Sequence, residues 1–444
     1  MSPLTIMAIL LVLLTYLWSL IPVSSKSNHI KLPPGPRSLP IIGNLHMLGN
    51  LPHRSLQQLA KKYGHIMFIR LGNVPTIVVS SPKAAELFLK THDNNFVSRP
   101  KSQSSEYLSY GTKGMIFSQY GPYWSHMRKL STLHFLCQAK MKAFEPLRKE
   151  ELGVLVRKLK RTTEEGGGLT KRLKKVSKMI DQLLEKILDE HEQVANTKNG
   201  KQGQHEDFVD MLLSLTNQPL NQNDEQVHFL DRTNVKAILL DMIVAAFDTS
   251  ATSIVWSLAE LLRHPRIMKN LQEELQNVVG MDRMVEESDL PKLDYLSMVV
   301  KESFRLHPVA PLLVPRESIE DITIDGYDIP KKSRIIVNIW SIGRDPNVWS
   351  ENVEEFYPER FMNNNIDLQG HDFQLIPFGS GRRGCPGMQL GLTTVRLVLA
   401  QLVHCFNWEL PTGMQPQDLD MAENFGLNVS KAKHLLAKPI YRLM

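Results

Sequence analysis

Apolar residues recur every three or four positions over most of this chain, which is the periodicity of an amphipathic helix. This spacing predicts helices over residues 181–191, 208–215, 235–263, 265–279, 295–306 and 389–406. Strand-like runs are short. Residues 65–82 form one predicted hairpin around Gly72-Asn73, and residues 322–330 form another around Asp325-Gly326, followed by an apolar strand over residues 334–340. The predicted fold class is therefore mainly α with small β-sheets.

The segment 232–265 predicts a helix of about 30 residues, or about 45 Å at 1.5 Å per residue. Its length suits a membrane span, but Lys236, Asp241, Asp248 and Glu260 interrupt the apolar run. We therefore expect the central helix of a large helical domain.

The N-terminus carries no charge until Lys26, so its apolar stretch is long enough to cross a bilayer. A cleaved signal peptide is the alternative, but no basic region precedes the stretch and no A-x-A site follows it. Lys26, Lys31 and Arg37 place the rest on the cytoplasmic side. We expect a membrane anchor over residues 1–25, a proline-rich hinge over 26–44 and one domain over 45–444.

Composition is that of an ordinary globular protein, with 42% hydrophobic and 22% charged residues in 444. The net charge is +6, and its excess lies within residues 157–178, as a solvated helix face or a basic docking surface. Cys137, Cys385 and Cys405 form no CxxC pair, which argues against disulfides and structural zinc. We expect no nucleic-acid partner, and Cys385 acts alone if it acts at all.

Residues 377–387 read PFGSGRRGCPG, which contains a literal G-x-G-x-x-G at Gly379, Gly381 and Gly384. A dinucleotide site also needs a βαβ unit and an acidic residue about 20 positions further on. No Asp or Glu occurs between Asp372 and Glu409, so this interpretation is disfavoured.

A cysteinate metal ligand explains the loop better, because a thiolate needs positive potential and hydrogen-bond donors. Arg382 and Arg383 supply charge, the glycines free backbone N–H groups, and Pro386 begins a helix whose N-terminus points at Cys385. The assembly fits a haem iron held by one cysteine.

The loop resembles the cysteine loop of the cytochrome P450 monooxygenases. Their pattern F-x-x-G-x-R-x-C-x-G is matched at Phe378, Gly381, Arg383, Cys385 and Gly387. The resemblance implies a P450 fold, haem b (iron protoporphyrin IX) as cofactor and Cys385 as the iron ligand, with the other four residues at the cofactor.

Further P450-like motifs follow in the family's order. Trp124 and Arg128 resemble its W-x-x-x-R helix, which implies hydrogen bonds to a haem propionate, and Arg316 stands where a second propionate donor is common. E-x-x-R and PERF motifs imply a structural triad, which comprises Glu302, Arg305 and Arg360.

Residues 245–250, AAFDTS, are similar to the family's oxygen-binding motif. The resemblance implies that Thr249 holds dioxygen and Asp248 relays protons. A threonine in mid-helix also bonds back to a carbonyl one turn earlier without any such role. Ala246 departs from the usual glycine, which implies a slightly narrower notch.

The resemblance is greatest to the plant endoplasmic-reticulum branch, which oxidises specialised metabolites such as terpenoids, phenolics and biphenyls. It implies a single-pass membrane enzyme with a cytoplasmic catalytic domain, and an NADPH-cytochrome P450 reductase that passes electrons from NADPH. A hydrophobic substrate pocket is expected from residues 102–117, 245–246, 309–314 and 425–427, which are mostly apolar.

The chain is shorter than family members of about 500 residues, by roughly 50 to 60. The shortfall lies between Arg128 and Asp248, with a junction near residues 166–169. Our hypothesis is a splice or gene-model variant. Three interpretations remain: a monooxygenase, an oxygen-independent haem-thiolate isomerase or dehydratase, and an inactive truncated form.

Overall fold

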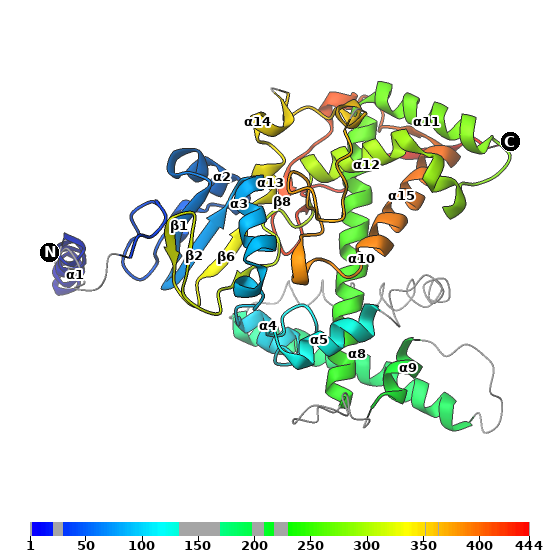
Figure 1. Cartoon of the computed structure of the whole chain (residues 1–444). Coiled ribbons are helices and arrows are strands. Elements are labelled where there is room, and N and C mark those ends of the chain that lie inside the picture. The colour runs from blue at the N-terminus through cyan, green and yellow to red at the C-terminus, as the bar shows by residue number, and fades with distance from the viewer. Residues whose placement is uncertain are drawn as a thin grey trace.

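The computed structural model describes residues 2–20, 30–132, 169–197, 208–216, 230–350, 352–362 and 364–443. Helices make up most of this part of the chain and the sheets are small, which confirms the predicted fold class (Figure 1). Cys137, residues 166–168 of the predicted junction and much of the basic run at 157–178 lie outside the described residues.

The longer helices match the apolar periodicity closely. The predicted segment 181–191 is part of a longer helix that also contains the basic residues 171–178. The α-helices of the described residues are α1 (Pro3–Leu20), α2 (Pro52–Tyr63), α3 (Pro82–Glu86), α4 (Gln103–Leu108), α5 (Pro122–Leu130), α8 (Leu169–Thr197), α9 (Phe208–Ser214), α10 (Arg232–Arg263), α11 (Pro265–Val279), α12 (Asp294–Leu306), α13 (Ile339–Ile342), α14 (Pro346–Trp349) and α15 (Met388–Cys405).

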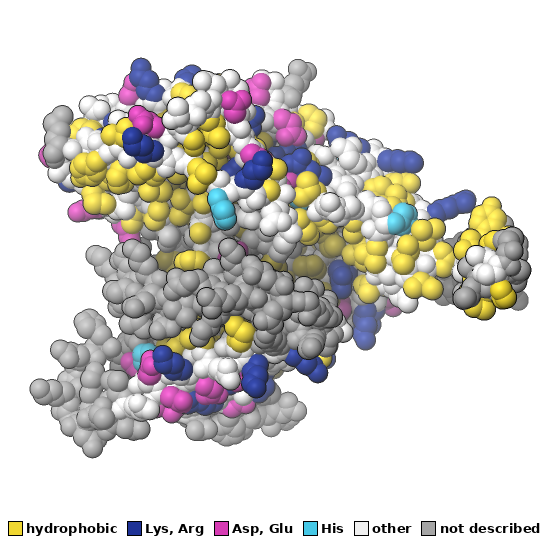
Figure 2. All heavy atoms as spheres, turned by 180° about the vertical axis from the view of Figure 1, so that it is seen from behind, with side chains coloured by type: hydrophobic (Ala, Val, Ile, Leu, Met, Phe, Trp, Pro, Cys, Tyr) yellow, Lys and Arg dark blue, Asp and Glu magenta, His cyan; other side chains and the backbone are white. Residues whose placement is uncertain are grey.

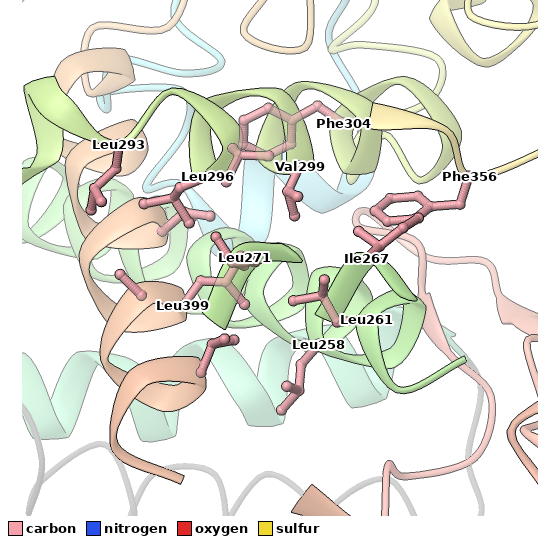
Figure 3. Packing of buried hydrophobic residues seen from close by; sticks show 14 of the residues in the cluster. Leu258, Leu261, Ile267, Leu271, Leu293, Leu296, Val299, Phe304, Phe356 and Leu399 are labelled. Carbon is pink, nitrogen blue, oxygen red and sulfur yellow. The ribbon is translucent and has the colours of Figure 1, made fainter. Parts of the chain in front are cut away.

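Helix α10 is the central helix that the sequence predicts. Among the described residues, it is the one helix found long and apolar enough to cross a membrane. However, it packs against α8, α11, α12 and α15. Side chains from α10, α11, α12 and α15, such as Leu261, Leu271, Leu296 and Leu399, form one buried cluster (Figure 3). This core holds α12 and α15 in fixed positions beside α10.

A four-stranded sheet lies at the other end of the body, in the order β1 (Ile66–Leu71), β2 (Val74–Val79), β6 (Arg334–Val337) and β3 (Arg316–Glu317) (Figure 1). Strands β1 and β2 form the predicted antiparallel hairpin, whereas β2 and β6 are parallel. Strand β6 is shorter than predicted, because Asn338 accepts a hydrogen bond from the Ser341 N–H and begins α13 (Ile339–Ile342).

The remaining sheets are two-stranded. Strands β4 (Ile322–Ile324) and β5 (Tyr327–Ile329) form the second predicted hairpin, with left-handed φ angles of 51° at Asp325 and 75° at Gly326. Strands β7 (Phe406–Glu409) and β10 (Lys438–Tyr441) pair, as do β8 (Glu423–Asn424) and β9 (Ser430–Lys431). The turn between β8 and β9 lies near the middle of α10.

Helix α1 lies apart from this body (Figure 1). Its apolar side chains, including Met7, Leu11 and Val12, are between 57% and 67% exposed. They form the apolar cluster at the right edge of the space-filling view (Figure 2).

Candidate active site

The predicted cysteine loop has a backbone that requires glycine. Gly379 and Gly381 have left-handed φ angles of 70° and 68°. A Cβ on Gly381 would lie 2.2 Å from the Leu89 carbonyl oxygen and 2.6 Å from Asp93 Oδ1. The Cys385 N–H donates to the Phe378 carbonyl over 2.9 Å, which folds the loop back on itself immediately before α15.

Cys385 presents an exposed side chain at the start of α15. The protein packed around the loop raises the pKa of this thiol, while the Gly387 N–H and the charge of Arg128 act in the opposite direction. The predicted backbone N–H donor is that of Gly387, whereas the positive charge comes from Arg128 rather than from the predicted Arg382 and Arg383. A thiol with a raised pKa is neutral at pH 7, whereas a metal ion deprotonates a thiol that coordinates it. A bound iron would therefore supply the positive charge that the thiolate form of Cys385 needs.

An arginine cluster lies beside this loop, and it comprises Arg99, Arg128, Arg316 and Arg383. Their charges repel one another: Arg316, Arg383 and Arg128 all lower the pKa of Arg99, after burial as the first cause. Burial first, then Arg316 and Arg128, lowers the pKa of Arg383 to about 9. Arg99 is a member of the cluster that the sequence motifs did not predict.

One buried carboxylate faces these arginines among the described residues. Asp93 accepts a hydrogen bond from Arg316 Nη1 over 2.6 Å, and Arg316 Nη2 donates to the Ser380 carbonyl of the cysteine loop. Arg383 instead donates to carbonyl oxygens, at 2.7 Å from both Val97 and Ser118. The excess of buried positive charge fits a ligand with two carboxylates, such as the propionates of haem.

Trp124 and Arg128 lie side by side on α5, as predicted. The Trp124 indole N–H donates to the Met115 carbonyl over 3.2 Å, and the Arg383 guanidinium lies 4.1 Å from the centre of its ring. Arg128 makes no ion pair with any described residue. It lines an open groove of about 500 Å³ that also contains Lys129 and Arg382. Arg128 is thus the guanidinium best placed to receive an anion.

The predicted oxygen-binding residues lie on an exposed stretch of α10. Thr249 Oγ1 donates to the Ala245 carbonyl over 2.5 Å, which is the back-bonded state that a mid-helix threonine adopts on its own. Asp248 accepts a hydrogen bond from the Asn428 amide. The side chains of Val244 and Phe247 are 42% and 50% exposed beside them, so this face of α10 is apolar and open.

A second carboxylate on α10, Asp241, was not among the predicted site residues. It is 5% exposed and accepts hydrogen bonds from the N–H groups of Met115 and Ile116. A Cβ on Gly114 would lie 2.3 Å from Asp241 Oδ2. Because the Met115 carbonyl accepts from Trp124 and, over 3.4 Å, from Arg383, Asp241 ties the loop before α5 to both residues.

Burial raises the pKa of Asp241 from 3.8 to about 6, and the two N–H groups reduce the shift. Its only signal in the sequence is a charge within an apolar helix.

The predicted triad is assembled. Glu302 is fully buried and accepts two hydrogen bonds of 2.8 Å from Arg305 and one of 3.0 Å from Arg360. The Tyr357 N–H adds a fourth, at 2.8 Å. Arg305 also donates to the Gly343 carbonyl, which connects α12 to the segment after β6. Both arginines donate their remaining N–H groups to backbone carbonyls. The triad therefore acts as a structural clamp, which ties neighbouring segments of the backbone together.

Comparison with known proteins identifies the family. The family model described as Cytochrome P450 matches residues 33–170 and 166–436, so the chain belongs to the cytochrome P450 family. Its members are haem-dependent monooxygenases, and haem fits the exposed thiol and the arginine excess of this site.

The relatives place it more narrowly, among the plant A-type enzymes. The chain is 54% identical to Cytochrome P450 CYP736A12 of Panax ginseng, over 96% of this chain and 97% of that protein. It is 40% identical to Cytochrome P450 71AP13 of Prunus mume, over 98% and 95%.

Solved structures agree on the fold. A zebrafish cytochrome P450 with abiraterone aligns with a TM-score of 0.73 at 25% identity, covering 89% of this chain and all of that one. Another structure, with progesterone, has a TM-score of 0.70 at 26% identity, over 88% and 99%.

The same comparisons show the predicted gap. The family model matches in two blocks that meet at residues 166–170. The alignment with the ginseng protein extends over 487 positions, whereas 96% of 444 residues is about 426, so about 60 positions face no residue of this chain. The size of the shortfall agrees with the prediction, and the meeting point of the two blocks supports its predicted position near residues 166–169.

Proposed function

We propose that this chain inserts one oxygen atom from O₂ into a hydrophobic plant specialised metabolite of terpenoid or phenolic type. The observation that carries the proposal is Cys385 at the start of α15, with its loop locked by glycines beside an excess of arginine. Haem bound there would supply oxygen activation, with the Cys385 thiolate as its iron ligand. Arg128 and Arg316 would hold its propionates, with Trp124 supporting them.

Residues on α10 would deliver protons and present a binding surface to the substrate. Asp248 would deliver protons toward Thr249, whose hydroxyl must leave the Ala245 carbonyl in order to donate elsewhere. Exposed Val244 and Phe247 would present an apolar surface to the substrate.

Electron supply and location complete the proposal. We infer an NADPH-cytochrome P450 reductase that docks through acidic groups on the basic side chains of Lys129 and Arg382, which line one open groove. Helix α1 belongs to an apolar run that carries no charge until Lys26, and this run would anchor the chain as a single span in the endoplasmic reticulum membrane, with the domain in the cytoplasm. The exposed apolar side chains of α1 support this, because the helix lies apart from the described body (Figure 1).

An inactive truncated form is the second candidate, and the two-block family match favours it. Removing packed helices exposes apolar side chains at about 1.5 to 3 kcal/mol each, against a total stability of about 5 to 15 kcal/mol.

The deciding experiment expresses the full chain in microsomes and records the reduced, carbon-monoxide-bound difference spectrum. We expect the red-shifted Soret band of thiolate-ligated haem. Cys385→Ala should abolish it, whereas Cys405→Ala, at a buried cysteine away from the loop, should retain it.

A band only after the missing segment is restored would establish the truncated form. If the chain turned over substrate without NADPH, the proposed function would be an oxygen-independent isomerase or dehydratase instead of a monooxygenase.

A further inference from the structure

Asn428 contacts the proposed proton relay from outside α10. Its side-chain amide donates to Asp248 Oδ2, and the two residues lie 180 positions apart in the chain. Asn428 belongs to the turn between β8 and β9, which begins after Asn424 and ends at Ser430. No motif in the sequence singles out this contact.

The backbone next to Asn428 is held on two sides. The Val429 N–H donates to the Val309 carbonyl over 2.8 Å, and the Val429 carbonyl accepts from the Trp256 indole over 2.9 Å. Trp256 is itself on α10, is 1% exposed, and stacks on His307 with ring centres 4.2 Å apart. The amide of Asn428 therefore has a fixed position relative to α10.

The other end of the turn is anchored as well. Glu423 accepts hydrogen bonds from His53 over 3.0 Å and from Arg54 over 2.8 Å, both on α2. Between the anchors, Phe425 and Leu427 are exposed. The turn is thus fixed at its ends, with one polar side chain directed at Asp248.

We propose that Asn428 is a positioning residue for proton delivery: its amide holds the Asp248 carboxylate in one orientation on the face of α10 beside Thr249. This rests on the proposed function. An amide N–H₂ group can only donate, so it matches a carboxylate oxygen that is free to accept. Losing the contact lets Asp248 rotate, and a misplaced proton donor lowers the fraction of reducing equivalents used productively.

The main variant is Asn428→Asp, which keeps the size but replaces the donor by a second carboxylate facing Asp248. Asn424→Asp is the matched control, because it makes the same change four residues earlier, at an exposed asparagine. In the holoenzyme we expect Asn428→Asp to raise peroxide released per NADPH consumed severalfold and to lower kcat more than it raises KM. Asn424→Asp should change neither.

A readout independent of turnover uses a double-mutant cycle on thermal unfolding. Asn428→Asp should lower the Tm by about 1–2 °C more than Asn424→Asp does. Adding Asp248→Asn exchanges donor and acceptor, so the double variant should recover that Tm. Its peroxide release should stay high, because the acid no longer lies on α10.

The inference would be overturned if the Tm changes of Asn428→Asp and Asp248→Asn simply added in the double variant. It would also be overturned if Asn428→Asp released no more peroxide per NADPH consumed than the wild type does. Asp248→Ala separates this from the wider proposal. If Asp248→Ala leaves peroxide release unchanged, the relay role of Asp248 fails. If it raises peroxide release and Asn428→Asp does not, only the positioning role fails.

Discussion

Asp241 makes the stability of this fold depend on pH in a way that one substitution removes. Its carboxyl has a pKa of about 6, above its ordinary value of 3.8, because burial penalises the charged form. A group with a raised pKa contributes stability that is fully present below pH 3.8 and is lost as the pH rises through 6. At neutral pH the ionised carboxylate therefore costs roughly 3 kcal/mol, for about two pKa units.

The magnitude follows from the same two values. Between pH 7 and pH 5, protonation of Asp241 should stabilise the wild-type chain by about 1 kcal/mol. Asp241→Asn keeps an oxygen that can accept from the Met115 and Ile116 N–H groups but does not titrate. The difference in unfolding free energy between wild type and this variant should thus change by about 1 kcal/mol over that range.

The assay is urea unfolding of the detergent-solubilised full chain at pH 5, 6 and 7. Asp294→Asn, the same change at an exposed aspartate at the start of α12, is the control and should keep the wild-type pH dependence. If Asp241→Asn also keeps it, the buried carboxyl does not titrate in this range and the reasoning is refuted. Asp241→Ala should be less stable to urea than Asp241→Asn at every pH, because the Met115 and Ile116 N–H groups lose their acceptor at a cost of roughly 1–3 kcal/mol each.

Two further predictions concern the clamp and the loop, and both use the carbon-monoxide difference spectrum of expressed protein. Glu302→Gln should lower stability by about 3–5 kcal/mol and abolish the band, because two buried guanidinium groups lose their counter-charge; a normal band would contradict the clamp. Gly381→Ala should also abolish the band, because its Cβ meets the Leu89 carbonyl oxygen at 2.2 Å. Gly413→Ala, at a φ of 85° with open space around it, is the control and should retain the band at a cost of about 1 kcal/mol.

Local patterns in the sequence predicted most of the helices and both hairpins. The spacing of apolar residues located α11 at residues 265–279 and α12 to within one residue, because these helices bury one face against a single core. The same reasoning placed the end of β6 too late, because the Asn338 side chain caps α13 and so ends the strand at Val337. Capping of that kind depends on one side chain rather than on a period.

In the candidate site, too, contacts within one local segment could be predicted from the sequence, whereas contacts between distant segments could not. Glu302 and Arg305 are close because they are three residues apart on one helix, so spacing alone predicts their contact. Arg360 joins them only through the fold, and its inclusion depended on family resemblance. The importance of the loop glycines, in contrast, could be predicted without family resemblance. Several glycines close to one cysteine already indicate a backbone that bends tightly around it, and Gly381 indeed has no room for a Cβ.

Residues that the sequence did not predict are those whose partners come from distant segments and leave no local pattern. Asp241 reads as a charge interrupting an apolar helix, and Gly114 reads as an ordinary loop glycine. Only when α10 packs beside the loop does the missing Cβ of Gly114 become the space that the Asp241 carboxylate occupies. The contact between Asn428 and Asp248 has the same origin. The side chain that faces the carboxylate of the proposed proton relay is therefore visible from the structure alone, and substitutions there should separate effects on stability from effects on chemistry.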